Sequence, residues 1–487
     1  MSVARRVLVR TYGCQMNVHD SEKVTNLLHH HGYTPTDRLD DADLLVINTC
    51  SIREKAEHHL YSDLGRLREW RNAATDRVLA VGGCVAQQEG DVLLRRFRHV
   101  DFVFGTHNLR LVPAMAEAAR AGSRQSRTEE SGSVERFDFP ERHPDFAGLH
   151  AGRAFVTVME GCDMFCSFCI VPRTRGREIS RPASAIVGEV EALAGRGVRE
   201  VTLLGQTVNA YGRHDLRRDA SKRARGAIIP RDTVGFAALL RRLAGIQGLR
   251  RIRYTSPHPL FFDSDLARAH AELPRLCPHV HLPLQSGSDA MLAAMRRRYT
   301  RDEYRRVAAL LREARPDIAL TTDLIVGYPG ESDADFRDTL ELVGEIGFVD
   351  SYSFKYSPRP GTAAADLPAR VAPEVAQARL EELQTLQRSL TLAAHRARVG
   401  ELTEILVEGE SRRGGGQLSG RDPYHRVVNF EAPAKAGVSE GDLVEVDLVA
   451  ATPHSLIGEL AGSGRRTAVK PAVEQADEWV RIGGVPS

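Results

Sequence analysis

Three strand-like runs near the start of the chain are each followed by a cysteine. The runs cover residues 7–11, 44–47 and 78–81, and the cysteines are Cys14, Cys50 and Cys84, separated by 36 and 34 residues. Apolar residues at helical spacing lie between the runs, around Val24 and again over residues 54–70. This β-α-β-α-β alternation predicts an open parallel sheet, and parallel strands place their carboxyl ends at one edge. We therefore expect the three thiols to converge at that edge, where open α/β sheets bind ligands.

Two explanations fit three cysteines at equivalent strand ends. They could be packing residues, because cysteine is among the residues most often buried. The flanking glycines Gly13, Gly82 and Gly83 favour a ligand role, because a residue without a side chain lets the backbone approach a bulky group.

The middle of the chain contains six further strand-like runs. Most are separated by a length that allows a helix, and they cover residues 154–159, 199–204, 250–255, 279–284, 319–326 and 350–356. Six β-α repeats predict a partial, open version of the β/α barrel. The polar and irregular stretch before them, residues 122–147, is interpreted as a linker.

The last part of the chain changes character. A helix is predicted to begin at Pro373, and short β runs separated by glycine-containing turns follow over residues 401–460, as in a small antiparallel barrel. The predicted fold class is therefore α/β with a terminal all-β barrel, in a chain whose 487 residues suggest about three folded units. The predicted units are an amino-terminal domain at 5–121, a barrel core at 148–385, a β domain at 388–460 and a disordered tail at 462–487.

Composition excludes several classes of protein. A hydrophobic content of 42% with 27% charged residues is that of a globular chain, and the net charge of +2 gives no global field toward nucleic acid or anionic lipid. No apolar run approaches the roughly 18 residues of a membrane helix, and seven cysteines, an odd number, do not suit a secreted disulfide framework. We expect a cytoplasmic protein outside the membrane, in which any RNA contact uses local patches.

A second group of three cysteines directly follows the first predicted barrel strand. Cys162, Cys166 and Cys169 fall within eight residues, where the loops of such a barrel bind ligands. A structural zinc would need a fourth ligand nearby, and no histidine occurs between His150 and His214, so an iron–sulfur cluster is the better interpretation. Three thiolates on a four-iron cluster leave one iron open to a substrate.

The C-x3-C-x2-C spacing resembles the radical S-adenosylmethionine superfamily, and nearly the whole chain resembles the methylthiotransferases. The segments that carry the second resemblance are TYGCQMN at 11–17, NTCSIREKA at 48–56, GCDMFCSFC at 161–169, PRTRG at 172–176, LGQTVNAY at 204–211, HLPLQSG at 281–287, DLIVGYPGE at 323–331, YSPRPGT at 356–362 and LSGR at 418–421. The resemblance implies two [4Fe-4S] clusters. The first triad (Cys14, Cys50, Cys84) would hold the cluster that carries the sulfur, and the second triad (Cys162, Cys166, Cys169) the cluster that binds S-adenosylmethionine and cleaves it to a radical.

Two motif variants point to one branch of this family. The forms CSIREKA at 50–56 and VNAY at 208–211 are most similar to the branch that adds a methylthio group to C2 of N6-isopentenyladenosine next to the anticodon of tRNA. Asp163 departs from that branch, which often carries Asn there. The resemblance implies tRNA as the partner and a low-potential electron donor such as a flavodoxin or ferredoxin, and it leaves the sulfur donor open.

Two alternatives remain open at this point. A sibling enzyme of the family, acting on a ribosomal-protein aspartate or on threonylcarbamoyladenosine, would share both triads and the barrel. A non-catalytic electron carrier with an RNA-binding tail would also hold two clusters, but carriers usually complete each cluster with four cysteines.

Four residues after barrel strands are candidates for binding S-adenosylmethionine. Gly205 and Gln206 end the second strand, and Gln285 and Ser286 end the fourth, so both pairs would lie at the active face. An amide there can bond ribose hydroxyls or the methionyl end of the ligand. The competing explanation is ordinary turn chemistry after a strand.

The terminal β domain resembles the TRAM module, an RNA-binding barrel. Residues 389–462 hold seven Lys or Arg against eleven Asp or Glu, so the module as a whole would repel a phosphate backbone. Only the span with Arg412, Arg413, Arg421 and Arg426 is locally basic, and RNA contact is expected from that face. A second basic stretch at 213–231 either follows tRNA phosphates or is a disordered surface insertion.

Overall fold

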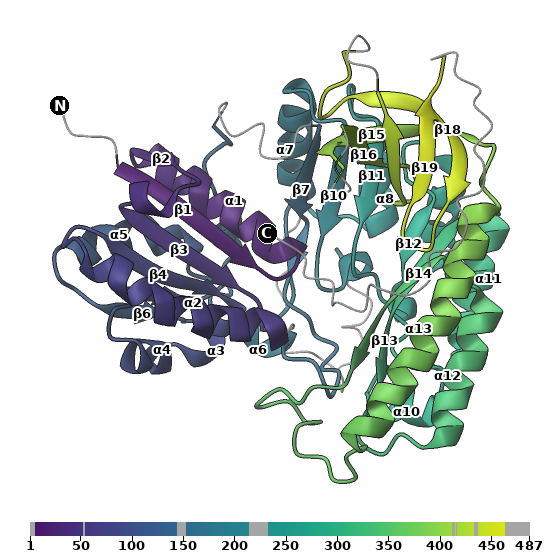
Figure 1. Cartoon of the computed structure of the whole chain (residues 1–487), viewed down its shortest axis with the longest axis horizontal. Helices are drawn as coiled ribbons and strands as arrows, with labels where there is room; N and C mark the ends of the chain where they lie inside the picture. The colour runs from purple at the N-terminus through teal and green to yellow at the C-terminus, as the bar shows by residue number, and fades with distance from the viewer. Residues whose placement is uncertain are drawn as a thin grey trace. The chain divides into compact units, whose positions relative to one another are not determined.

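The computed structural model divides the chain into two compact units, with the boundary between Ala394 and His395 (Figure 1). The structure describes residues 5–51, 54–143, 152–213, 232–411, 414, 416–432 and 437–462. Most of the predicted basic insertion and nearly all of the predicted tail lie outside these residues. Within them, no helix is both long and apolar enough to cross a membrane.

A six-stranded, all-parallel sheet forms the start of the first unit. Its spatial order is β2-β1-β3-β4-β5-β6, and the strands are β1 (Arg5–Tyr12), β2 (Tyr33–Pro35), β3 (Leu44–Thr49), β4 (Val78–Gly83), β5 (Phe102–Phe104) and β6 (Gln125–Arg127). The open parallel sheet predicted from the sequence is confirmed. It extends further than the three predicted strands, because β6 pairs with β5 from within the segment interpreted as a linker.

Helices cover both faces of this sheet. Helices α1 (Gln15–His30) and α5 (Val112–Arg120) pack on one face, through Val24 and Met115, and α2 (Glu54–Asn72) packs on the other, through Leu64. Strands β3 and β4 are buried at every position, which is typical of parallel strands covered on both sides. The short helices α3 (Cys84–Glu89) and α4 (Asp91–Arg96) follow β4.

Six parallel strands form the centre of the first unit, as predicted. They are β7 (Arg153–Thr157), β10 (Glu200–Leu204), β11 (Arg251–Tyr254), β12 (His279–His281), β13 (Ala319–Val326) and β14 (Asp350–Lys355). Their hydrogen bonds divide them into two sheets of three, β11-β10-β7 and β12-β13-β14. A single parallel bridge between Ile252 and Leu276, just before β12, joins the halves of this partial barrel.

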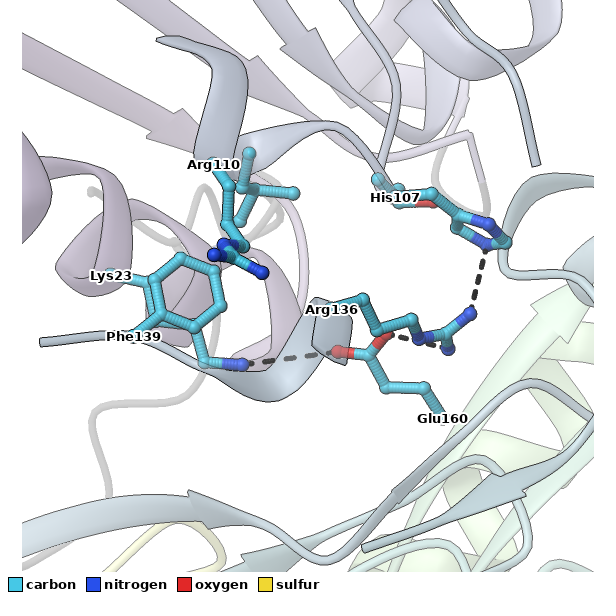
Figure 2. Close-up of a pocket in the computed structure, with 8 residues that line it drawn as sticks. Lys23, His107, Arg110, Arg136, Phe139 and Glu160 are labelled. Carbon is cyan, nitrogen blue, oxygen red and sulfur yellow. Dashed lines mark hydrogen bonds and ion pairs between the residues drawn. The ribbon is translucent and has the colours of Figure 1, made fainter. Parts of the chain in front are cut away.

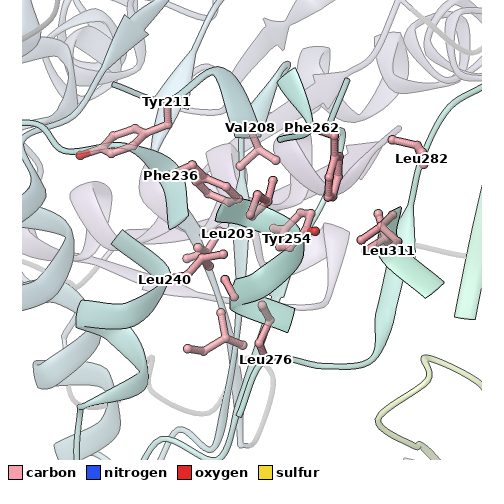
Figure 3. Close-up of a cluster of buried hydrophobic side chains, with 14 of the residues drawn as sticks. Leu203, Val208, Tyr211, Phe236, Leu240, Tyr254, Phe262, Leu276, Leu282 and Leu311 are labelled. Atoms are coloured by element: carbon pink, nitrogen blue, oxygen red, sulfur yellow. The ribbon is translucent and has the colours of Figure 1, made fainter. Parts of the chain in front are cut away.

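The main hydrophobic core lies between these strands and the helices outside them (Figure 3). The helices are α7 (Ala183–Gly195), α8 (Phe236–Ala244), α9 (Ser264–Glu272), α11 (Arg301–Ala314), α12 (Asp333–Ile346) and α13 (Pro373–Arg396). The ring of Phe236 on α8 meets that of Tyr254 on β11 edge-to-face, with 5.3 Å between centroids. Helix α13 begins at the predicted proline, and Leu383 joins the core from it. Shorter elements, β8 (Met159–Glu160), β9 (Ile179–Ser180), α6 (Val171–Thr174) and α10 (Asp289–Ala294), lie in the connections.

The second unit is a closed five-stranded barrel in the order β15-β16-β17-β19-β18. The strands are β15 (Leu402–Glu410), β16 (Gln417–Arg421), β17 (Val427–Glu431), β18 (Leu443–Ala451) and β19 (Leu456–Leu460), around a core that includes Ile405 and Phe430. The expectation of a purely antiparallel barrel is wrong in one respect, because β17 and β19 pair in parallel. A closed ring with an odd number of strands cannot alternate direction at every step, so at least one pair must be parallel.

Buried ion pairs join helix α1 to the segments around the first part of the barrel. Asp20 meets Arg175 at 2.6 Å, and Glu160 meets Arg136 at 2.7 Å and Lys23 at 3.8 Å. The side chains of Asp20 and Arg175 are 4% and 3% exposed, so water does not screen this pair. These contacts fix the amino-terminal sheet to the strand that leads into the second triad.

We predict that Asp20→Ala lowers the free energy of unfolding of the first unit by about 3–5 kcal/mol, because it leaves the Arg175 guanidinium buried without its carboxylate. Glu345→Ala is the matched control, since it removes the partner of Arg305 from an ion pair of 2.7 Å whose side chains are 30% and 45% exposed. Its expected cost is below about 1 kcal/mol. Urea unfolding followed by circular dichroism measures both, and equal effects would contradict the prediction.

Candidate functional site

The structure brings the first triad together at the carboxyl edge of the amino-terminal sheet. Strands β1, β3 and β4 are neighbours, with Tyr12 in register with Thr49 and Thr49 with Gly83. Cys50 and Cys84 directly follow β3 and β4, whereas Cys14 follows β1 by two residues and is the N-cap of α1. The Cys50 thiol hydrogen-bonds with both Cys14 and Cys84. The predicted convergence of these thiols is therefore present in the fold.

Glycines let the backbone close tightly around Cys50. A Cβ on Gly13 would lie 2.3 Å from the Cys50 Cβ, and one on Gly83 would lie 2.3 Å from the Asn48 Oδ1. Both glycines have positive φ, of 139° and 94°, which strains any other residue. Gly82 instead faces the ring of Phe104, which a Cβ would approach to 2.2 Å.

Electrostatics favours thiolates at two positions of the first triad. The hydrogen bond from Cys50, aided by the charge of Arg175 and opposed by burial, lowers the pKa of Cys14 to about 6 and that of Cys84 to about 7. The same hydrogen bonds, with Cys14 and then Cys84, raise the pKa of Cys50 well above its ordinary value. The Cys50 thiol therefore favours the thiolate form of Cys14 and Cys84.

A buried amide pair supports the first triad. The Cys14 Sγ lies 3.2 Å from the Asn17 Oδ1, and the Asn17 Nδ2 donates to the Asn48 Oδ1 at 3.2 Å. The Asn48 Nδ2 donates back to the Asn17 carbonyl at 2.9 Å. Sequence reasoning assigned no role to Asn17 or Asn48 individually, although both lie inside the motifs that carry the family resemblance.

The second triad lies on the loop between β8 and α6. The Cys162 Sγ is 3.2 Å from the Thr207 Oγ1, and the Cys166 Sγ accepts a hydrogen bond of 3.3 Å from the Arg297 Nη1. The Cys169 N–H donates to the Cys166 carbonyl at 3.0 Å. Burial raises the pKa of Cys162 and of Cys169 to about 12. Without a bound cation these two cysteines are thiols, in contrast to Cys14 and Cys84.

The residues on either side of Cys162, Gly161 and Asp163, anchor the loop of the second triad. Gly161, with φ of 82°, approaches Arg177 so closely that a Cβ would lie 2.1 Å from the Arg177 carbonyl oxygen. Its N–H donates to the Gln206 Oε1 at 2.5 Å. Asp163 accepts a 2.6 Å hydrogen bond from the Arg177 Nε, so this departure from the family pattern anchors the loop.

The candidate S-adenosylmethionine residues make contacts within the protein. A Cβ on Gly205 would lie 2.7 Å from the Met159 Cγ, and Gln206 uses its amide oxygen on Gly161. Ser286 is fully buried with its hydroxyl 3.3 Å from that of Thr339 on α12. Gln285 has a positive φ of 72° and pairs its backbone with Asp323 and Ile325. The binding of S-adenosylmethionine by these four residues stays a prediction.

Strained backbone gathers near the second triad, which the sequence does not signal. Among the described residues other than glycine, Phe165 within the triad loop has positive φ, as do Gln285, Arg296 and Arg298. The last two flank Arg297, which contacts Cys166. Such conformations cost energy and concentrate at functional sites.

Charged side chains line a small cavity in the first unit (Figure 2). Glu160, two residues before Cys162, pairs there with Arg136 and Lys23, the latter on the helix that begins after Cys14. Burial acts to raise the pKa of Glu160, but Arg136, Lys23 and Arg175 outweigh it and lower that pKa to about 2. Glu160 is therefore ionised, and its partners in the cavity wall are Arg136 and Lys23.

The candidate RNA-binding arginines of the second unit differ in their surroundings. Arg421 on β16 donates to Glu408 at 3.1 Å and keeps 31% of its side chain exposed. Arg426 is buried, with 8% exposure. Arg412 and Arg413 lie outside the described residues.

We predict that metal-free protein alkylates faster at Cys14 than at Cys169 near neutral pH, although both are partly exposed. Alkylation needs the thiolate. The Cys14 rate should rise through half its maximum near pH 6, whereas that of Cys169 should still be rising at the most alkaline pH tested. Iodoacetamide labelling with peptide mass spectrometry measures both rates. In Cys50→Ala the Cys14 inflection should move to higher pH, and an unmoved inflection would contradict the hydrogen-bond explanation.

Three family models match consecutive parts of the chain. Residues 6–105 match an uncharacterized protein family (UPF0004), residues 156–343 match the radical SAM superfamily, and residues 396–461 match the TRAM domain. A radical S-adenosylmethionine methyltransferase, TsrM, from Kitasatospora setae has a similar fold, with a TM-score of 0.54 at 16% identity over 74% of this chain and 77% of that one.

Curated relatives align over almost the whole chain. The tRNA-2-methylthio-N(6)-dimethylallyladenosine synthase of Geobacter metallireducens is 48% identical over 464 residues, which is 95% of this chain and 99% of the relative. The enzyme of the same name from Cereibacter sphaeroides is 45% identical over 95% of this chain and 100% of its own length. With both triads in place and this identity over 95% of its length, the chain belongs to the radical SAM methylthiotransferases, in the family of tRNA-2-methylthio-N(6)-dimethylallyladenosine synthases.

Proposed function

We propose that this enzyme adds a methylthio group to C2 of N6-isopentenyladenosine next to the anticodon of tRNA, and that each triad holds a [4Fe-4S] cluster. The observation that carries the proposal is the presence of two separate sets of three thiols, one at the ends of three parallel strands and one on a loop of the barrel. Two sites with an open iron would separate the delivery of sulfur from the generation of the radical.

The chemistry of the donor sets fits iron–sulfur clusters. Among the described residues, no three His, Cys, Asp or Glu side chains have the arrangement expected around a single metal ion. A four-iron cluster does not require that arrangement, because each thiolate binds a different iron atom. Thiolates are soft ligands and select this kind of centre, and each triad supplies three of them.

The surroundings of each triad suit an anionic centre. The charge of Arg175 acts to lower the pKa of Cys14 and of Cys84. The Arg297 guanidinium donates a hydrogen bond to the Cys166 Sγ. A guanidinium beside a sulfur stabilises its thiolate form. When bound, the cluster of the second triad would supply the electron for reductive cleavage of S-adenosylmethionine. The side chains of Cys162 and Cys166 are buried, whereas Cys169 is partly exposed.

We predict that Cys166→Ala abolishes cleavage of S-adenosylmethionine and removes about half of the iron, because only the cluster of the second triad is lost. Cys50→Ala should also lose about half of the iron but keep reductive cleavage, and it should yield no methylthio product. Iron and sulfide analysis and chromatography of 5′-deoxyadenosine measure these outcomes on anaerobically reconstituted protein.

Cys277→Ala is the matched control for both variants, since Cys277 is a buried cysteine that belongs to neither triad. It should keep all of the iron and the activity. Cleavage that survives in Cys166→Ala, or normal methylthio product from Cys50→Ala, would contradict the assignment of the triad concerned.

The substrate follows from the names of the relatives and from the motif variants at residues 50–56 and 208–211. We predict that tRNA from a strain lacking this protein accumulates N6-isopentenyladenosine and lacks its 2-methylthio derivative. Mass spectrometry of digested nucleosides measures both, and the gene restored on a plasmid is the control. If isopentenyladenosine were unchanged and a ribosomal protein or threonylcarbamoyladenosine lost its methylthio mark, the sibling activity would be correct instead.

The parts of the chain take distinct roles in this proposal. Residues 5–121 would carry the sulfur, residues 148–385 would generate the radical, and residues 388–460, which include the TRAM match, would bind RNA. Among the described candidates, Arg421 offers the more exposed charge for a phosphate contact. The electron donor of the flavodoxin or ferredoxin type and the cytoplasmic location stay predictions.

A further inference from the structure

Helices α11, α12 and α13 pack against one face of the sheet β12-β13-β14. Parallel partners in register carry their side chains on the same face, and Asp323 is in register with Tyr352, and Ile325 with Phe354. The alternate residues, including Leu320 and Leu324, are buried in the main core on the helical side. Tyr352 and Phe354 therefore lie on the face opposite to the core.

Two large aromatic side chains on this face are exposed. Tyr352 is 58% exposed and Phe354 is 46% exposed, and they stand two residues apart on β14. Most large apolar side chains of this unit are buried in its cores, so two such rings on one strand face need an explanation. Contiguous exposed apolar surface commonly marks a binding site.

Polar groups adjoin the Tyr352 ring. The His281 ring lies 5.9 Å from it between centroids, at an interplanar angle of 65°. The His281 Nε2 is 3.2 Å from the Asp323 Oδ2, and its Nδ1 is 3.0 Å from the Thr321 Oγ1. The face thus combines flat apolar rings with a hydrogen-bonding edge. This combination suits a nucleobase, which has a flat ring and polar edges, better than an apolar peptide.

The same face continues to the loop of the second triad. Ile325 packs against a buried cluster of Met291, Met295 and Tyr328, and Phe168 from the triad loop packs against it as well. Phe168 also packs against the cluster that contains Cys162 and Cys166. The Ser167 Oγ lies 2.8 Å from the Tyr328 hydroxyl. A base resting on this face would therefore be close to the loop at which the radical is proposed to form.

We propose that Tyr352 and Phe354 form a stacking platform for the target purine of the RNA substrate, with His281 and Asp323 at its polar edge. This inference rests on the proposed function, and it adds the residues that receive the base. Unpaired bases of anticodon loops can be splayed out and stacked on aromatic side chains, and such stacking tolerates a substituent on the ring edge.

The test measures whether the contribution of the target base to RNA affinity depends on the rings of Tyr352 and Phe354. The probes are a synthetic anticodon stem-loop RNA with N6-isopentenyladenosine at the target position and the same RNA with an abasic site there. Binding is measured by fluorescence anisotropy on the full reconstituted enzyme. We expect the abasic probe to bind the wild-type enzyme at least tenfold more weakly, and the variant Y352A/F354A to bind both probes equally, because the stacking partner has been removed.

Two control variants separate stacking from general damage. Y352F keeps the ring and should retain the wild-type preference for the intact base. V92A removes a 48% exposed side chain on α4 and should also leave that preference unchanged. All three variants should keep their iron and should cleave S-adenosylmethionine without RNA, which shows that the fold and the second triad are intact.

The outcomes distinguish this inference from the proposed function. If Y352A/F354A penalises the abasic probe as strongly as wild type does, the base rests elsewhere and the platform is wrong, while the proposed function stands. If the wild-type enzyme binds the two RNAs equally, the base contributes nothing to binding and the platform is wrong. The proposed function fails only if the reconstituted enzyme forms no methylthio product on the RNA with the intact base.

Discussion

The buried charges of helix α1 hold the amino-terminal sheet and the barrel segments in one arrangement. Asp20 and Arg175, and Lys23 and Arg136 around Glu160, are removed from water, so each ion depends on its partner for compensation. Such pairs give little net stability compared with apolar packing, but they tolerate few alternative geometries. The proposed transfer of a group from the first triad to a substrate activated at the second would require a fixed geometry between them. Arg175 also lowers the pKa of Cys14 and Cys84, although it comes from the segment just after the other triad. Arg175 therefore links the two triads in two ways, through its ion pair with Asp20 and through its effect on the pKa of Cys14 and Cys84.

The two triads differ in how they would acquire metal. Cys14 and Cys84 already favour the thiolate through the Cys50 hydrogen bonds, so iron would meet charged ligands at the strand ends. Cys162 and Cys169 have a pKa of about 12 through burial, so binding there must release protons from thiols. Loading of the second triad should accordingly depend more steeply on pH than loading of the first. This difference has its origin in the fold, because the first triad gathers three thiols in mutual contact and the second lies in an apolar loop.

Local patterns in the sequence predicted much of the fold and of the candidate site. The spacing of Cys14, Cys50 and Cys84 by one β-α repeat predicted their convergence, because parallel strands end at one edge. Features set by partners far apart in the chain could not be read in this way. The pairing of Asp20 with Arg175 spans 155 residues, and no periodicity signals it. The short strand β6 has an intermediate to exposed burial pattern and a polar sequence, so it lacked the apolar run that identifies a parallel strand. The exposed rings of Tyr352 and Phe354 lie in the run 350–356, which the sequence predicted only as a barrel strand, because alternation alone does not say which face the helices cover.

The closure of the second unit into a ring limits how that unit can bind other molecules. Since the described strands β15 to β19 close into a ring, each has a neighbour on both sides, and their backbone donors and acceptors are committed within the ring. A partner chain cannot join such a structure by adding a strand. A folded nucleic acid, which is recognised through phosphates, sugars and base faces, makes no such demand. The proposed contact of the barrel with RNA would therefore use its outer side chains and loops.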